Sequence, residues 1–266
     1  MSILRTILTG VLLALIGPLC VYAQSMGALD VKTKAFDGQA KALRADGKAG
    51  SLARKRFYLF RGGIKDNPEL MGRLRKAEIK SRDCFYTQMK ASSQYICWLQ
   101  AANCESPYCR TVAADDIPRV PEFLTAYNAG LTKFRGLKTV ADDWILTNMP
   151  ETLVSGFFRE RRALTTSLIG NTQIVQSTMT DGAAVVATFI DIPITLPKDK
   201  KTETFLVSNI QPLEIGNKSY IWACEVEIGV EKKAPLALPD PTKPPKTCEV
   251  IVRDLPACKT ESCKTT

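Results

Sequence analysis

The sequence contains no histidine among its 266 residues. Without imidazole, the chain can form neither a Ser-His-Asp triad nor a Cys-His catalytic pair, and no zinc site can use a histidine ligand. Hydrophobic residues make up 45% and charged residues 24%, which excludes a wholly disordered or collagen-like chain. The composition indicates a globular protein of one or two domains, without the commonest routes to catalysis.

Long apolar runs are also missing, except at the amino terminus. There Arg5 precedes the run from Ile7 to Ile16, Gly17-Pro18 interrupts the helix, and Val21-Tyr22-Ala23 matches a signal-peptidase site. The run is shorter than the roughly 20 residues that a membrane-spanning helix needs. We therefore expect residues 1–23 to be a signal peptide that is cleaved after Ala23. The mature protein is then periplasmic or extracellular and has no transmembrane anchor.

The chain has nine cysteines, of which Cys20 belongs to the predicted signal. A lipid anchor on Cys20 is the alternative, which the bulky Leu19 before it disfavours. The other eight are an even number in an oxidising compartment, which is typical of a disulfide framework. They form two groups of four: Cys84, Cys97, Cys104 and Cys109, then Cys224, Cys248, Cys258 and Cys263.

The pairing of these cysteines stays open at this point. If it remains within each group, three connectivities are possible per group, and Cys224 must pair with Cys248, Cys258 or Cys263. Zinc binding by four cysteines and a redox-active pair are the alternatives. Because no Cys-x-x-Cys pair occurs, we expect structural disulfides, with no metal and no cofactor.

Positive charge is concentrated near the amino terminus. The net charge is +9, and the segment from Lys32 to Arg82 holds 15 basic and 5 acidic residues. Outside the cell, its partner would be an anionic envelope component, such as a lipid head group or acidic polysaccharide, or an acidic protein; nucleic acid is not expected. The alternative is a solvated helix face with no ligand. The candidate anion-binding residues are Arg54, Lys55, Arg56, Arg61, Arg73, Arg75 and Lys76.

The first half of the chain predicts helices after a flexible basic lead-in at 24–50. Within a mainly helical domain at 51–169, Asn67-Pro68 and Pro121 are typical helix starts, while Phe57–Phe60 predicts a strand that Gly62-Gly63 ends. A longer helix after Pro150 should turn both Phe157 and Phe158 inward. The charged stretch Arg159–Arg162 in its middle should be mostly solvated.

The second half predicts strands. Tyr220, Trp222, Cys224, Val226 and Ile228 alternate with Ser219, Glu225 and Glu227, which indicates a strand with one apolar face. We expect a small antiparallel β-sandwich at 170–233, a proline-rich linker at 234–246 and a cysteine-rich tail at 247–266. The predicted class is α+β, with a cysteine-bridged helical half before the sandwich.

A short stretch of this second half resembles a known family. Thr180-Asp181-Gly182, Phe189 and Asp191-Ile192-Pro193 are similar to the middle of carboxypeptidase regulatory-like domains, which are transthyretin-like sandwiches. The similarity covers about fifty residues. Here the turn is shortened, and Ile194-Thr195 follows Pro193 where the family has glycine and an aromatic strand. The whole chain also resembles uncharacterised secreted bacterial proteins with such a domain, through Phe57–Phe60, the Cys104–Cys109 block and Trp222-Ala223-Cys224-Glu225. The resemblance implies a non-catalytic accessory module and no peptidase activity.

Two functions follow from these observations. The first is an exported, non-catalytic binding or structural protein of the cell envelope. The second is a histidine-free, glycan-directed hydrolase that uses paired carboxylates. For the second, the candidate acids are Asp115, Asp116, Asp142, Asp143 and Glu151, although Asp142-Asp143 also fit the first turn of a helix.

Overall fold

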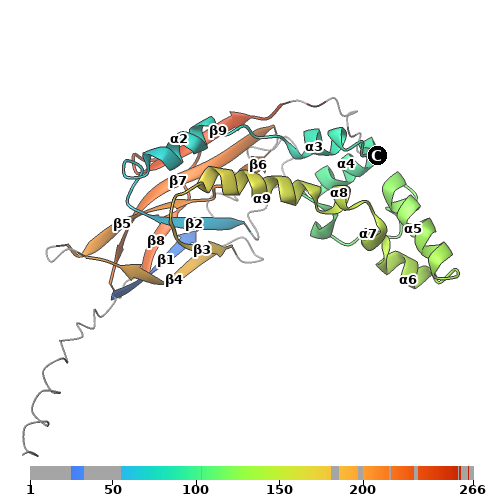
Figure 1. Cartoon of the computed structure of the whole chain (residues 1–266), viewed down its shortest axis with the longest axis horizontal. Coiled ribbons are helices and arrows are strands. Elements are labelled where there is room, and N and C mark those ends of the chain that lie inside the picture. Colours follow the sequence, from blue (N-terminus) through green and yellow to red (C-terminus); the bar gives the residue numbers. More distant parts are fainter. Residues whose placement is uncertain are drawn as a thin grey trace, which may run out of the picture.

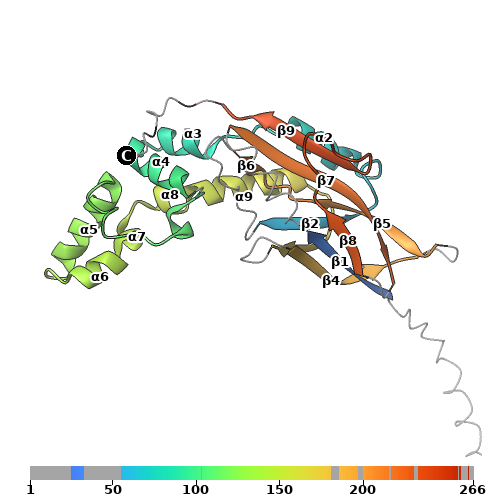
Figure 2. The same ribbon diagram turned by 180° about the vertical axis from the view of Figure 1, so that it is seen from behind.

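The computed structural model describes residues 25–32, 55–102, 104–180, 186–196, 200–215, 217–230, 233–256, 258 and 263. The predicted signal peptide, Arg54 and most of the predicted lead-in lie outside these residues. Helices and sheets occur together, which confirms the α+β class (Figure 1). Two packed sheets carry two helices on one outer face, and further helices form a unit at one end (Figures 1 and 2).

The smaller sheet has three strands in the order β4-β1-β8. β1 (Ser25–Lys32) pairs antiparallel with β4 (Val186–Ile194) and parallel with β8 (Lys233–Ala237). A bulge between Gly27 and Leu29 shifts the β1–β4 register. Strands from the beginning, middle and end of the chain therefore share this sheet.

The larger sheet has the order β3-β2-β5-β7-β6, and β9 pairs with the other edge of β7. Every pairing in it is antiparallel. Its strands are β2 (Arg56–Arg61), β3 (Ile174–Met179), β5 (Thr202–Ser208), β6 (Leu213–Ile215), β7 (Lys218–Gly229) and β9 (Cys248–Asp254).

Both faces of the larger sheet are covered. The predicted apolar face of β7 includes Trp222 and Val226. It packs in one core with Leu29 and Phe189 of the smaller sheet. The opposite face was expected to be polar, but Ile221 and Ala223 lie there under helices α2 (Pro68–Lys76) and α9 (Gly156–Ile169). This second cover explains why Ser219 is also buried.

The remaining helices form the end unit around a second core of aromatic side chains. Tyr86, Tyr95, Trp98 and Phe123 are in contact there, mostly edge to face. Ser92 caps the helix that follows it, because its side chain accepts a hydrogen bond from the Tyr95 amide. The helices are α3 (Arg82–Gln88), α4 (Ser93–Ala101), a 3-10 turn η1 (Pro107–Cys109), α5 (Pro121–Lys133), α6 (Lys138–Asp143), α7 (Ile145–Asn148) and α8 (Glu151–Val154).

Four disulfides link the eight predicted cysteines. Cys104–Cys109 and Cys224–Cys248 stay within the two sequence groups. Cys84–Cys258 and Cys97–Cys263 join one group to the other, so pairing within each group is wrong for these four. The reason is that β9 runs along β7 and brings the carboxyl-terminal segment back to α3 and α4.

The structure also differs from the predicted linear division of the chain. β1 lies in the predicted lead-in, and β2 lies in the predicted helical domain, where it is held between β3 and β5. β8 begins the predicted proline-rich linker, and its Pro235 is tolerated because β8 is an edge strand. The predicted tail contains β9. Hydrogen bonds between strands that are distant in sequence, which local periodicity cannot reveal, cause all four differences.

In the part of the chain that the structure describes, no helix has the length and apolar character to cross a bilayer. The described residues also include no cluster of three or more acidic or cysteine side chains placed to hold a metal ion.

Candidate functional site

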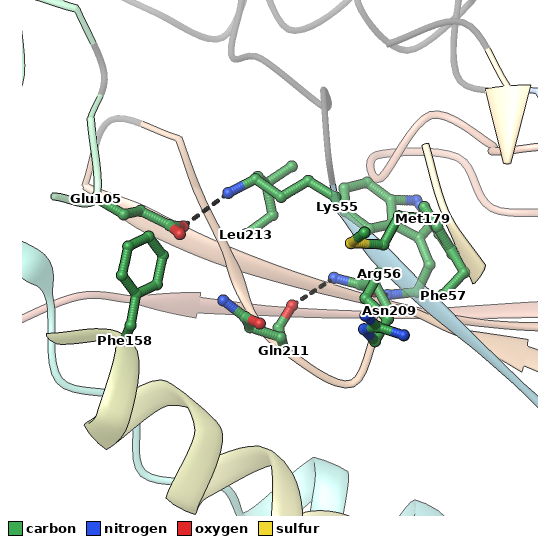
Figure 3. Close-up of a pocket in the computed structure, with 10 residues that line it drawn as sticks. Lys55, Arg56, Phe57, Glu105, Phe158, Met179, Asn209, Gln211 and Leu213 are labelled. Carbon is green, nitrogen blue, oxygen red and sulfur yellow. Dashed lines mark hydrogen bonds and ion pairs between the residues drawn. The ribbon is translucent and has the colours of Figure 1, made fainter. Parts of the chain in front are cut away.

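A pocket of about 140 Å³ lies where the larger sheet meets α9 and the Cys104–Cys109 loop (Figure 3). Half of its lining is apolar and half is polar. The apolar residues are Phe57, Phe158, Met179, Leu213 and Trp222, and the polar ones are Lys55, Arg56, Glu105, Asn209 and Gln211.

Lys55 and Glu105 form the charged pair of this pocket. The Lys55 ammonium nitrogen lies 2.8 Å from the Glu105 Oε1 atom, and the two side chains face each other in Figure 3. The Lys55 amide donates to the Thr180 hydroxyl at 2.9 Å, which fixes the backbone just before β2. Burial acts to raise the pKa of Glu105, but the charges of Lys55, Arg161 and Arg82 outweigh it and lower that pKa. Glu105 is therefore a carboxylate at neutral pH.

The loop that carries Glu105 is fastened on several sides. The Cys104–Cys109 disulfide closes it, and the Tyr86 hydroxyl donates to the Glu105 carbonyl at 2.9 Å. Arg82 donates from Nη1 to the Cys104 carbonyl at 3.1 Å. The position of the Glu105 carboxylate is thus set by the core of the helical unit, so little ordering is needed when a ligand arrives.

Asn209 and Gln211 lie in the connection between β5 and β6, but only the side chain of Asn209 is hydrogen-bonded within the fold. The Asn209 amide donates to the Gln211 and Tyr220 carbonyls and accepts from the Trp222 amide at 2.7 Å. Its role is to hold the loop against β7. Gln211 is half-buried, and its side-chain amide makes no hydrogen bond to the described residues. That amide remains available to a ligand.

Two apolar side chains at this pocket are unusually exposed. Phe158 is 42% exposed and Met179 is 50% exposed, although both line the pocket. The expectation that Phe158 points inward is wrong. One turn of α9 spans 3.6 residues, so the neighbours Phe157 and Phe158 cannot both face the same core.

Arg56 is the second cation of the lining. It pairs with Met179 in the β2–β3 register, and its Nη1 atom donates to the Ser177 hydroxyl at 2.9 Å. The residue is exposed and has no ion pair within the described residues. Its guanidinium can therefore accept an anion without first giving up a carboxylate.

A buried charge cluster stands behind the pocket. Arg161 on α9 is 2% exposed, which contradicts the expectation that residues 159–162 are solvated. It donates to Glu214 on β6, and the Phe157 ring lies 4.8 Å from its guanidinium carbon. Burial lowers the pKa of Arg161 to about 10, while the charges of Glu105 and Glu160 act to raise it. Arg161 stays charged at neutral pH and ties the helical unit to the sheet.

The predicted anion-binding residues do not form one surface. Lys55 and Arg56 line the pocket, whereas Arg61 lies at the opposite end of β2, paired with Glu203 and stacked over Phe205. The other three lie on α2.

The two arginines on α2 are engaged within the fold. Arg73 donates to the last carbonyls of α9, at Leu168 and Ile169, both at 2.8 Å. Arg75 forms two 2.7 Å hydrogen bonds to Glu249 on β9. Lys76 is exposed and has no ion pair among the described residues.

The acids proposed for a hydrolase are not brought to the pocket. Asp116 accepts from the Ala113 amide at 3.0 Å, and Glu151 pairs with Arg159 on the surface. Asp142 and Asp143 end α6, so their expected place in a first helical turn is wrong. Glu105 is the sole carboxylate among the ten lining residues, and the lining contains no serine, threonine or cysteine.

A larger hollow of about 760 Å³ lies between α9 and the segment before α3. Lys80 and Glu160 on its rim pair with each other at 3.4 Å, and Arg161 donates to Glu214, so neither cation of its lining is without a carboxylate partner. We therefore regard the Lys55–Glu105 pocket as the candidate site.

Of the ten lining residues, the sequence analysis named only Lys55 and Arg56 as candidate site residues, and Glu105, Phe158 and Gln211 are among those that it missed. Glu105 lies inside a conspicuous cysteine pair, which could have drawn attention to it. Nothing in the sequence distinguishes Gln211.

Scans against protein-family models, curated proteins and solved structures found no match for this chain. The resemblance to carboxypeptidase regulatory-like domains therefore stays a prediction.

Proposed function

We propose that this is an exported, non-catalytic binding protein that takes a small anionic group with an apolar portion into the Lys55–Glu105 pocket. The observation that carries the proposal is the combination of lining groups. Arg56 and the Gln211 amide are donors without a carboxylate partner, and they lie beside Phe158, Met179 and Trp222. A few convergent polar groups in an apolar recess are typical of ligand sites.

The charge and the volume of the pocket limit the kinds of ligand that it can bind. The lining carries two cations and one carboxylate, and Lys55 already neutralises Glu105, so a carboxylate or phosphate would find Arg56 as its partner. A cavity of roughly 150 Å³ holds a molecule the size of benzene. The pocket therefore suits one side chain or head group of an acidic partner, and not a polymer segment.

The same lining argues against the hydrolase. Glycosidases of the common type need two carboxylates on either side of the bond that breaks. This pocket has one, and its lowered pKa keeps it from acting as a proton donor at neutral pH. The lining also contains no serine, threonine or cysteine that could act as a nucleophile, which is a further argument against a hydrolase.

Export is supported by two features. The amino-terminal sequence has the order of charge, apolar run and small residues typical of a signal peptide. Four disulfides are characteristic of proteins that fold in an oxidising compartment. The resemblance to accessory sandwich domains agrees with a role in binding.

The proposal can be tested by thermal shift with benzoate, phenylacetate, phenyl phosphate and short peptides ending in glutamate, using uncharged analogues as references. We expect at least one anionic compound to raise the unfolding temperature of the wild-type chain. The gain should disappear in Arg56→Ala and in Phe158→Ala but persist in Arg162→Ala, which removes an exposed arginine elsewhere on α9. No stabilisation by any compound, or equal stabilisation of Arg56→Ala, would refute the pocket as the binding site.

A further inference from the structure

The turn between α5 and α6 is the outermost part of the helical unit. Figures 1 and 2 show it at the end of the molecule opposite to β1 and β4. α5 ends at Lys133 and α6 begins at Lys138, so residues 134–137 form the turn. A protruding turn of this kind can reach a flat surface without interference from the sandwich.

The turn and its flanks have an unusual composition. Between Glu122 and Asp142 the sequence contains no acidic residue, while Lys133, Arg135 and Lys138 surround the turn. All three cations are exposed, and none has an ion pair within the described residues.

Two apolar side chains are exposed among these cations. Leu137 is 59% exposed and Val140 is 38% exposed. They are three residues apart at the start of α6, so they lie on the same side of that helix. The tip thus has an apolar centre with a basic rim.

The conformation of the turn is firmly held. Arg135 and Gly136 both have left-handed backbone angles, with φ of 52° and 84°. The Gly136 amide donates to the Leu131 carbonyl at 2.8 Å, and the Leu137 amide donates to the Phe134 carbonyl at 3.1 Å. The first is the hydrogen bond of a helix end closed by a left-handed residue, and the second closes the turn that leads into α6.

The aromatic side chains near the turn pack against each other within the helical unit. Phe134 packs edge to face on Trp144 with ring centres 5.0 Å apart, and the Lys133 ammonium lies 3.8 Å from the Trp144 ring centre. An apolar interior is therefore close to the turn, yet Leu137 is directed away from it.

We propose that this tip, defined by residues 133–140, docks on a membrane surface that contains anionic lipids. Cations at the rim would meet the phosphate groups, while Leu137 and Val140 would enter the boundary between head groups and acyl chains. Charge complementarity and the convex shape favour a planar anionic surface over a grooved partner. Asp142 and Asp143 at the far end of α6 restrict the contact to the first turn of that helix. This inference is independent of the Lys55–Glu105 pocket.

The test is sedimentation of the full exported chain with vesicles of phosphatidylglycerol and phosphatidylcholine, compared with pure phosphatidylcholine vesicles. The wild-type chain should bind the mixed vesicles more tightly, and raised salt should weaken the binding. Leu137→Ser should weaken it about tenfold, which corresponds to the loss of one partly inserted apolar side chain. Arg135→Glu/Lys138→Glu should abolish it.

Two matched controls separate the tip from general surface properties. Ile190→Ser removes an apolar side chain that is 58% exposed on β4, and Lys200→Glu/Lys201→Glu makes the same charge change elsewhere. Both should bind as the wild type does. The inference fails if the wild type shows no preference for phosphatidylglycerol, or if either control loses as much binding as the tip variants.

Discussion

Arg161 on α9 and Glu214 on β6 are joined by a buried hydrogen-bonded ion pair across 53 sequence positions. Glu214 also accepts from the backbone amide of Arg82, at the start of α3. One carboxylate thus connects the sheet to two helices. The contact holds α9 and α3 against β6, and α9 and β6 also contribute Phe158 and Leu213 to the Lys55–Glu105 pocket.

Removing one partner of this pair should destabilise the protein strongly. Arg161→Met leaves the Glu214 carboxylate with an incomplete set of donors in a low-dielectric region, a change that typically costs about 3–5 kcal/mol. The measurement is urea unfolding followed by circular dichroism. Arg162→Ala, at the neighbouring exposed position, should change the free energy of unfolding by less than about 0.5 kcal/mol. Equal stability of the two variants would show that the ion pair contributes nothing.

The two disulfides that join the sequence groups should act non-additively. Cys84–Cys258 and Cys97–Cys263 have sequence separations of 174 and 166 residues, but each closes only a short loop while the other is intact. Removing either one by serine substitution should cost about 3 kcal/mol, and removing both should cost more than twice that. Unfolding of the single and combined variants checks this.

The connectivity itself can be checked by mass spectrometry. The exported chain should begin at Gln24 and lack eight hydrogens relative to its reduced form. Non-reduced peptides should join Cys84 to Cys258 and Cys97 to Cys263. Peptides that pair these cysteines within their own sequence groups would contradict the fold of the carboxyl-terminal segment.

Glu105 should make stability depend on acidity. The pKa of Glu105 in the folded protein lies below the ordinary glutamate value of 4.5, so its ion pair contributes stability that is fully present above that value. This contribution is lost as pH falls through the lower folded-state pKa. Thermal unfolding between pH 7 and pH 3 should therefore show Glu105→Gln well below the wild type at neutral pH, with the gap narrowing in acid. Glu69→Gln, which alters an exposed carboxylate, should change the unfolding temperature little. A gap that stays constant with pH would exclude the ion pair as the cause.

Gly27 should be intolerant of a side chain. A Cβ atom there would lie 2.5 Å from Ile194 Cδ1 and 2.7 Å from Ile228 Cγ2, inside the sandwich. Gly27→Ala is expected to cost about 1–3 kcal/mol through overpacking. Gly72→Ala on α2 meets no atom within 4 Å and should stabilise the chain by about 0.5–1 kcal/mol through helix propensity. If Gly27→Ala is neutral, β1 is not held in the sandwich as described.

Local features of the sequence predicted local structure well. Pro68 and Pro121 begin helices, Arg56–Arg61 is a strand, and the apolar face of β7 is the one that alternation indicated. These features depend on neighbours within one helical turn or one strand, where backbone geometry dictates the spacing of buried residues. An even number of cysteines likewise predicted four disulfides.

Only the tertiary structure revealed the features that depend on residues distant in sequence. β1 is a strand because β4 and β8 supply its hydrogen bonds, from more than 150 residues away. Arg161 is buried because Glu214 and the Phe157 ring compensate a charge that would otherwise stay in water. The pocket joins Lys55, Glu105 and Gln211 from three separate segments. Composition and periodicity determined the class, the predicted export signal and the disulfide framework, whereas long-range pairing of strands and charges determined the sheets and the candidate site.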